Sequence, residues 1–212
     1  MQRPKAFRKM LFNSLTYIVF LTLMVLGFWS LPHRYRQPFL LAGSLLFYCS
    51  WRWEYSLLLI GLIGTDFYLG QRLQSPRSRF HKVFAVAINL AVLAFFKYLG
   101  FFAQTINDIS AFLLGNRPVP VLHLLLPLGI SFYTFQLMSY LIDVARGDRE
   151  PEPRLRSFAL YPLFWPHLIA GPIVRSHELI PQFQRPQVFS YERFCEGLKY
   201  ILYGLFLKVV LE

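Results

Sequence analysis

Residues 124–148 read LLLPLGISFYTFQLMSYLIDVARGD, and residues 157–175 read SFALYPLFWPHLIAGPIVR. The first stretch predicts an apolar helix long enough to cross a bilayer, which takes about 20 residues. The second is equally apolar but cannot form one regular helix, because proline removes a backbone donor and clashes with the preceding turn. Its prolines are Pro162, Pro166 and Pro172. A segment with both signs of charge, 145–156, separates the two stretches.

A spanning helix followed by a broken apolar segment is typical of membrane proteins that line an internal cavity. Irregular backbone survives at membrane depth only where protein or water satisfies its polar groups. We therefore predict a proline-broken re-entrant hairpin over residues 158–174, and we expect the function of the protein to be located there, inside the membrane.

The composition of the 212-residue chain points to the same class. Hydrophobic residues make up 55% of the chain and charged residues only 16%, against about 25% charged residues in soluble domains. The net charge is +11, and the cations stand in short clusters between apolar runs, as in cytoplasmic loops that face anionic lipid. We therefore predict an all-α, polytopic membrane helical bundle whose partner is membrane lipid and not nucleic acid.

The apolar runs predict five transmembrane spans within residues 15–142. They are 15–31, 39–49, 55–70, 83–103 and 121–142. The run 106–114 is too short to cross a bilayer and is expected at the interface, and a further helix is expected over 194–211. An outside N-terminus places most loop cations on the inner side, and we predict this orientation.

The two ends of the chain carry expectations of their own. The basic segment 1–14 precedes the first span without a cleavage site, and Met10 is an alternative start. Residues 208–212 lie in the middle of an apolar helix with no cap. We therefore expect the chain to be the front part of something longer.

One histidine, His167, lies within the proline-broken segment, in WPHLIAGP. A polar side chain at membrane depth is a candidate for function, but prolines also release backbone carbonyls that an imidazole can bind. We favour the structural role. The spacing of His167, His177 and Cys195 is too loose for a metal site, and no metal is predicted. Cys49 and Cys195 are expected to be inert, buried thiols.

Several charged residues lie in or beside the predicted spans. Burying an unpaired charge there costs about 2.5–3.5 kcal/mol, so Lys97 and Asp66 must pair, reach the interface or line a wet cavity. Asp143 is expected to form an ion pair with Arg146, and Arg175 to bind an anion or to anchor the hairpin at the lipid head groups.

Five collinear motifs resemble the membrane-bound O-acyltransferases, and most closely their bacterial alginate O-acetyltransferase branch. They are MLFNSLTYIVF from Met10, FFKYLGFF around Lys97, LPLGISFYTFQLMSYLIDVARG from Leu126, WPHLIAGPIVR from Trp165 and GLFLKVVL from Gly204. They cover nearly the whole chain from Met10, and LPLGISFYTFQ followed by the xPxLIAGPIxR hairpin is a specific combination.

The resemblance implies a multi-pass enzyme of the bacterial inner membrane. It would pass an acyl group, usually acetyl, from a cytoplasmic thioester-type donor through a membrane-embedded tunnel to a hydroxyl of an extracytoplasmic polysaccharide such as alginate. No bound cofactor is expected, and separate periplasmic proteins are expected partners. The candidate residues lining a cavity or a substrate are Gln136, Asp143, His167, Arg175 and Lys97.

The general base is where the chain departs from the family pattern. In such enzymes a histidine takes the proton of the acceptor hydroxyl, and the resemblance places that histidine in a segment beyond residue 212. His167 does not match it and is only a weak candidate, so we predict that residues 1–212 alone are inactive. Two alternatives are a non-catalytic scaffold of exopolysaccharide assembly and a small transporter, although transporters usually carry paired broken helices and this sequence has one.

Overall fold

A computed structural model describes residues 14–73, 79–114, 126–168 and 171–210. Within these ranges the chain is all-helical, as predicted, and contains no strand. The helices are α1 (Leu15–Ser30), α2 (His33–Cys49), α3 (Trp53–Arg72), α4 (Arg79–Leu114), α5 (Ile130–Arg146), α6 (Leu155–Leu163), α7 (Trp165–Leu168), α8 (Ser176–Gln184) and α9 (Tyr191–Val210). The alternative start at Met10 lies outside the described residues.

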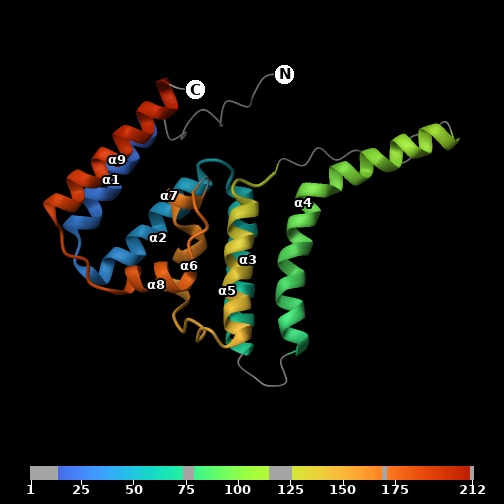
Figure 1. Cartoon of the computed structure of the whole chain (residues 1–212), viewed down its shortest axis with the longest axis horizontal. Coiled ribbons are helices and arrows are strands. Elements are labelled where there is room, and N and C mark those ends of the chain that lie inside the picture. The colour runs from blue at the N-terminus through green and yellow to red at the C-terminus, as the bar shows by residue number, and fades with distance from the viewer. Residues whose placement is uncertain (1–13, 74–78, 115–125, 169–170, 211–212) are drawn as a thin grey trace.

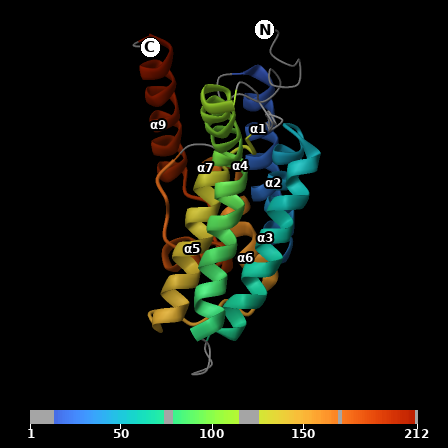
Figure 2. The ribbon, with the colours of Figure 1, turned by 90° about the vertical axis from the view of Figure 1, so that its right-hand side faces the viewer.

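Helix α5 is the centre of the fold. It contacts α3, α4, α6 and α8, and Figure 2 shows α3, α4 and α5 side by side. Apolar and polar side chains alike are buried on it, including Tyr133, Leu137 and Tyr140 at 0% exposure. A helix buried on most sides in this way packs against several neighbours, and its polar side chains can form hydrogen bonds with them.

Glycines in the left-handed conformation mark both ends of α5. Gly129 has φ 71° and precedes the first turn, while Gly147 has φ 83° and follows the last. At the C-terminal end the Gly147 N–H donates to the Val144 carbonyl at 3.1 Å, and the Asp148 N–H donates to the Asp143 carbonyl at 3.0 Å. This is a Schellman motif, which satisfies carbonyls that the helix leaves free. Helix α5 begins at Ile130 and ends at Arg146, whereas the predicted span was 121–142. The first residues of that span, 121–125, lie outside the described ranges.

Helix α4 differs from the prediction. We expected a span over 83–103 and a separate interfacial segment over 106–114, but one helix of 36 residues covers both. No proline or cap signal interrupts Arg79–Leu114, so the backbone hydrogen bonds continue through it. Figure 1 shows its second half bending away from the other helices.

The predicted broken hairpin is irregular, and its first part, residues 158–168, is mostly buried. Helix α6 ends at Leu163, one residue after Pro162, and Phe164 takes ψ 109°, which breaks the helix before the single turn of α7. Phe158, Tyr161 and Leu168 are at most 1% exposed. Figure 1 shows α6 and α7 lying between α2 and α5. Residues 158–168 are therefore part of the core, whereas residues 171–173 are exposed.

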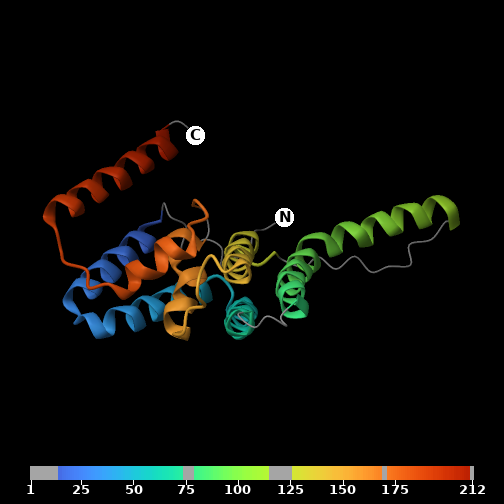
Figure 3. The same ribbon diagram turned by 60° about the horizontal axis from the view of Figure 1, so that its bottom comes forward.

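One described helix is long and apolar enough to cross a membrane by itself, residues His81–Phe112 of α4. Helix α1 is apolar but has 16 residues, fewer than the roughly 20 that a perpendicular span takes. Helix α9 leaves most of its apolar side chains exposed, and Figure 3 shows it standing apart from the rest of the chain. The five-span arrangement stays a prediction.

The two left-handed glycines give a matched test of the fold. A Cβ at Gly129 would collide with the Leu168 carbonyl oxygen, whereas a Cβ at Gly147 would meet nothing within 4 Å. Both alanine variants carry left-handed strain of about 1–2 kcal/mol. Gly129→Ala should therefore lower the free energy of unfolding by more than Gly147→Ala does, as measured by denaturant titration in detergent. Equal losses would contradict the packing of α7 against the start of α5.

Candidate functional site

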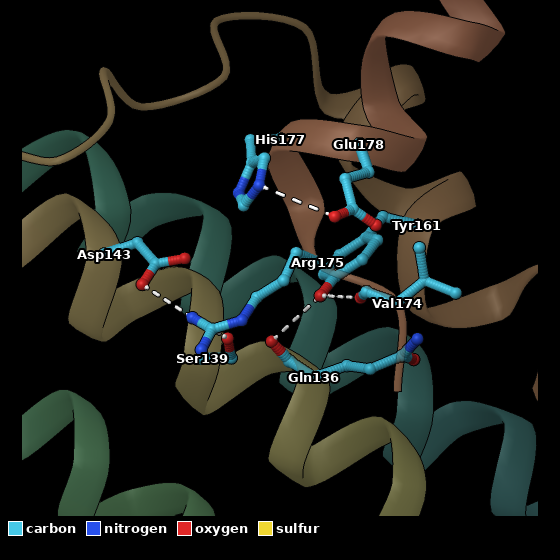
Figure 4. Close-up of polar contacts among 8 residues, drawn as sticks. All are labelled: Gln136, Ser139, Asp143, Tyr161, Val174, Arg175, His177 and Glu178. Atoms are coloured by element: carbon cyan, nitrogen blue, oxygen red, sulfur yellow. Dashed lines mark hydrogen bonds and ion pairs between the residues drawn. The ribbon is translucent and has the colours of Figure 1, made fainter. Parts of the chain in front are cut away.

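The hydroxyl of Tyr161 joins the broken hairpin to the central helix. Tyr161 lies on α6, and its hydroxyl is 3.0 Å from the carbonyl oxygen of Val174 and 3.4 Å from that of Gln136. Val174 belongs to the non-helical stretch before α8, and Gln136 belongs to α5 (Figure 4). The phenol has one proton, and its shorter contact is with the Val174 carbonyl, which the irregular segment cannot satisfy through a helix. Sequence analysis did not single out Tyr161, because an aromatic in an apolar run gives no signal of such a role.

An ion pair forms the second connection between the hairpin and α5. Arg175 Nη1 lies 3.2 Å from Asp143 Oδ1 and 3.5 Å from Ser139 Oγ (Figure 4). The Asp143 side chain is 12% exposed and that of Arg175 is 57% exposed. The expected pairing of Asp143 with Arg146 is wrong, because Asp143 faces the interior of the bundle while Arg146 is exposed. Arg175 anchors the hairpin to a helix, and its remaining N–H groups stay accessible.

The charged segment between α5 and α6 is also fixed, through Glu152. This residue is 6% exposed. Gln184 of α8 donates to its carboxylate at 2.9 Å, Gln71 of α3 donates to its carbonyl at 2.7 Å, and its own N–H donates to the Tyr140 hydroxyl at 2.8 Å. Side chains of α3, α5 and α8 therefore all form hydrogen bonds with Glu152. The flanking prolines in EPEP were the only sequence signal of a rigid segment here.

His167 makes contacts of the kind that a structural role requires. Its Nε2 lies 3.0 Å from the carbonyl oxygen of Tyr161, and its ring packs against Phe164, with the centroids 5.5 Å apart. The Tyr161 carbonyl is free because α6 ends before residue 165 could donate to it. A carbonyl only accepts, so Nε2 carries the proton. The imidazole therefore caps the end of α6.

The other two candidates lie differently. Gln136 is 2% exposed and stands on the face of α5 that meets Tyr161. The Lys97 side chain is exposed on α4, and its ammonium group is 5.5 Å from the ring centroid of Tyr98. The structure brings Asp143 and Arg175 into contact, whereas Gln136 meets the hairpin through its backbone carbonyl and Tyr161, with its side chain pointing away in Figure 4. No contact among the described residues joins Lys97 to them.

Asp66 has the partner that its position requires. It is 0% exposed on α3, and both of its oxygens lie 2.9 Å from Asn89 Nδ2 of α4. The same amide nitrogen donates to the Ala85 carbonyl at 3.1 Å. This buried polar contact ties α4 to the bundle at one point.

The described residues offer no group of three or more His, Cys, Asp or Glu side chains that could hold a metal ion. His177 lies 3.8 Å from Glu178 at the start of α8 (Figure 4). Cys195, the third ligand weighed in the sequence, is a free thiol on α9.

Comparison with known proteins adds information that the geometry lacks. A probable alginate O-acetylase AlgI of Pseudomonas aeruginosa is 35% identical over 206 residues, which are 94% of this chain and 39% of that protein. The corresponding protein of Azotobacter vinelandii is 35% identical over 94% of this chain and 41% of its own length. The chain is a homologue of the bacterial alginate O-acetylases. This similarity is consistent with the resemblance to the N-terminal portion of the membrane-bound O-acyltransferases.

A peptidoglycan O-acetyltransferase of Helicobacter pylori is more distant, at 31% identity over 95% of this chain and 44% of that protein. The chain itself therefore spans about two fifths of the length of these relatives. No family model matches the chain. No solved structure matches it either.

The Asp143–Arg175 pair predicts a local effect on the hairpin and not a global one. An ion pair with one exposed partner contributes about 0–1 kcal/mol to stability, so Asp143→Ala should barely change the unfolding midpoint. It should, however, free the hairpin end and speed trypsin cleavage after Arg175 several-fold, as followed by mass spectrometry. Asp148→Ala, in the exposed turn after α5, is the matched control. Unchanged cleavage in Asp143→Ala would contradict an anchoring role.

The buried contact between α3 and α4 predicts strong coupling. Asn89→Leu leaves the Asp66 carboxyl group without its donor and should cost about 1–3 kcal/mol. The double variant Asp66→Leu/Asn89→Leu replaces both partners by apolar groups and should recover most of that loss. Denaturant unfolding of the single and double variants measures the coupling. Additive losses would mean that the two side chains do not interact.

Proposed function

We propose that this chain forms the hairpin-bearing part of an O-acyltransferase that acetylates hydroxyl groups of an extracytoplasmic polysaccharide. The observation that carries the proposal is the 35% identity to alginate O-acetylases over 94% of the chain. The buried, α5-anchored hairpin supports it, since the motifs of the resemblance meet there. Alginate is the acceptor that the names of these relatives favour, and the peptidoglycan relative widens the class to other cell-surface glycans.

The reaction moves an acetyl group from sulfur to oxygen. The acceptor hydroxyl attacks the carbonyl carbon of a cytoplasmic acyl thioester, the C–S bond breaks, and an ester C–O bond forms. The hydroxyl proton goes to a general base and then to the departing thiolate, because a hydroxyl is a poor nucleophile until its proton is taken. His167 donates its Nε2–H to the Tyr161 carbonyl, so only its Nδ1 is left to accept a proton, and it does not match the histidine of the family pattern. The base belongs to the later segment of the family pattern.

In this proposal, the chain shapes the site and positions the reacting groups. Tyr161, Asp143 and Arg175 hold the hairpin against α5, so its irregular backbone forms a wall of fixed shape. The guanidinium of Arg175 is oriented by Asp143 and still offers N–H groups to a ligand. It would hold an anionic group of the donor or of a uronic acid acceptor through charge-assisted hydrogen bonds.

The same proposal places the protein in the bacterial inner membrane as a multi-pass protein. Helix α4 provides one segment of sufficient length, and the basic clusters fit loops on the cytoplasmic side. The acyl donor would enter from that side and the glycan from the other, where separate periplasmic proteins take part. No cofactor remains bound between turnovers.

A chimera tests this function. Residues 10–210 of this chain replace the matching segment of the Pseudomonas aeruginosa alginate O-acetylase, and the O-acetyl content of secreted alginate is measured. The chimera should restore acetylation. Arg175→Gln should lower it about ten- to a hundredfold, because a charge-assisted hydrogen bond contributes about 1.5–3 kcal/mol. Arg156→Gln, an exposed arginine at the start of α6, should leave it unchanged.

Two outcomes would contradict the proposal. One is a chimera that inserts and folds, as shown by its yield and circular dichroism, but leaves alginate unacetylated. The other concerns the base: purified residues 1–212 that transfer acetyl groups at a rate abolished by His167→Ala would show that the base lies in this chain.

A further inference from the structure

An apolar groove of about 380 Å³ runs between α1 and the hairpin, on the side away from α5. Its walls are apolar side chains of α1 and of α7 and α8. They include Leu21, Val25, Phe28, Trp165, Leu179 and Phe183. Every one of these residues lies within the described ranges. A concave apolar site of this size takes a chain-like apolar ligand more readily than a polar one.

One end of the groove is polar and basic. A smaller recess of about 40 Å³ adjoins it and shares Phe28 and Phe183 with it. The basic side chains that line this recess are His33, Arg36 and Arg185. The guanidinium of Arg36 is fixed there, because its Nε donates to the Leu31 carbonyl at 3.0 Å and its Nη1 donates to the Gln187 carbonyl at 2.7 Å.

The recess also holds a polar atom without a partner. Gln37 is 7% exposed, and its Nε2 donates to the Phe183 carbonyl at 2.8 Å. Its Oε1 is buried and has no hydrogen-bond partner among the described residues. An unpaired buried acceptor is unfavourable, and because Gln37 lines the recess, a rotation of its amide would turn Oε1 toward a hydroxyl donor of a ligand there.

We propose that the groove binds an anionic phospholipid, with one acyl chain along α1 and α8 and the head group at the basic recess. The chemistry of the two ends distinguishes this occupant from others. A neutral lipid would leave Arg36 and Arg185 without a counter-ion, and a helix of a protein partner would not bring a phosphate to them. The recess follows the α1–α2 turn, which the charge pattern places on the cytoplasmic side, where anionic lipids attract clustered arginines.

Phosphatidylglycerol is the probe, since its phosphate suits the arginines and its glycerol hydroxyls suit Gln37. Trp165 lines the groove and is 4% exposed, so it reports on the occupant. Replacing the other three tryptophans, Trp29, Trp51 and Trp53, by phenylalanine leaves it as the sole indole. Titration of the full chain in detergent with phosphatidylglycerol brominated on its acyl chain should quench Trp165 with saturation. Phosphatidylcholine with the same chains should need several-fold more lipid.

Two pairs of variants locate the two ends. Val25→Phe places a ring in the groove and should abolish the saturable quenching, whereas Val19→Phe, on an exposed face of the same helix, should not. Arg185→Gln should remove the preference for phosphatidylglycerol, whereas Arg52→Gln, in the α2–α3 turn, should keep it. Native mass spectrometry of the chain with all its tryptophans counts bound lipid for the same variants, which covers the case in which the single-tryptophan protein does not fold.

The proposal fails if both lipids quench Trp165 equally at every concentration, because the basic end would then select nothing. It also fails if Val25→Phe binds phosphatidylglycerol as well as Val19→Phe does, because the lipid would then lie elsewhere. Saturable, charge-selective binding that only Val25→Phe and Arg185→Gln disturb supports it. Loss of acetyl transfer in the chimera would leave this result unaffected, since lipid binding is measured without turnover.

Discussion

The fold depends on how an irregular segment satisfies its backbone within an apolar core. Helix α6 ends one residue after Pro162 and α7 lasts a single turn, so carbonyls that a longer helix would have paired need other donors. Tyr161 donates its hydroxyl to the Val174 carbonyl, next to the Gln136 carbonyl of α5, and the Nε2–H of His167 donates to the carbonyl of Tyr161. Unsatisfied polar groups cost several kcal/mol in a hydrocarbon environment. These few side chains therefore decide whether the hairpin can stay buried.

The charged residues Asp143, Arg175 and Glu152 also connect elements that are separate in the sequence. Asp143 meets Arg175 across 32 positions of sequence, and Glu152 is held by Gln71 from α3 and Gln184 from α8. Each contact connects a non-helical stretch either to α5 itself or to a helix that contacts α5. Their individual contributions to stability are modest, but they determine where the hairpin lies. If the proposed transfer function holds, guiding a substrate past this wall depends on fixed geometry more than on extra stability.

Much of this arrangement follows from local patterns in the sequence, and the remainder does not. Pro162, Pro166 and the apolar runs around them predict a broken, buried segment, which the structure has. Asp143 was assigned to the nearer arginine, because sequence spacing does not say which face of α5 is buried. The continuity of α4 was missed, since short polar positions within Arg79–Leu114 imitate an interface. Tyr161 and Glu152 were missed because their roles arise from partners far away in the chain.

The central claim is that the proline-broken segment lies inside the membrane domain, packed against α5. Hydroxyl-radical footprinting of the protein in lipid nanodiscs tests it most directly, since the label reaches only side chains that water reaches. Tyr161 is 0% exposed and Trp165 4%, whereas Tyr35 is 47% and Tyr191 74% exposed. The account predicts that Tyr161 and Trp165 are protected while Tyr35 and Tyr191 are oxidised. Oxidation of Tyr161 and Trp165 at the rate of Tyr191 would show a watery surface loop and contradict it.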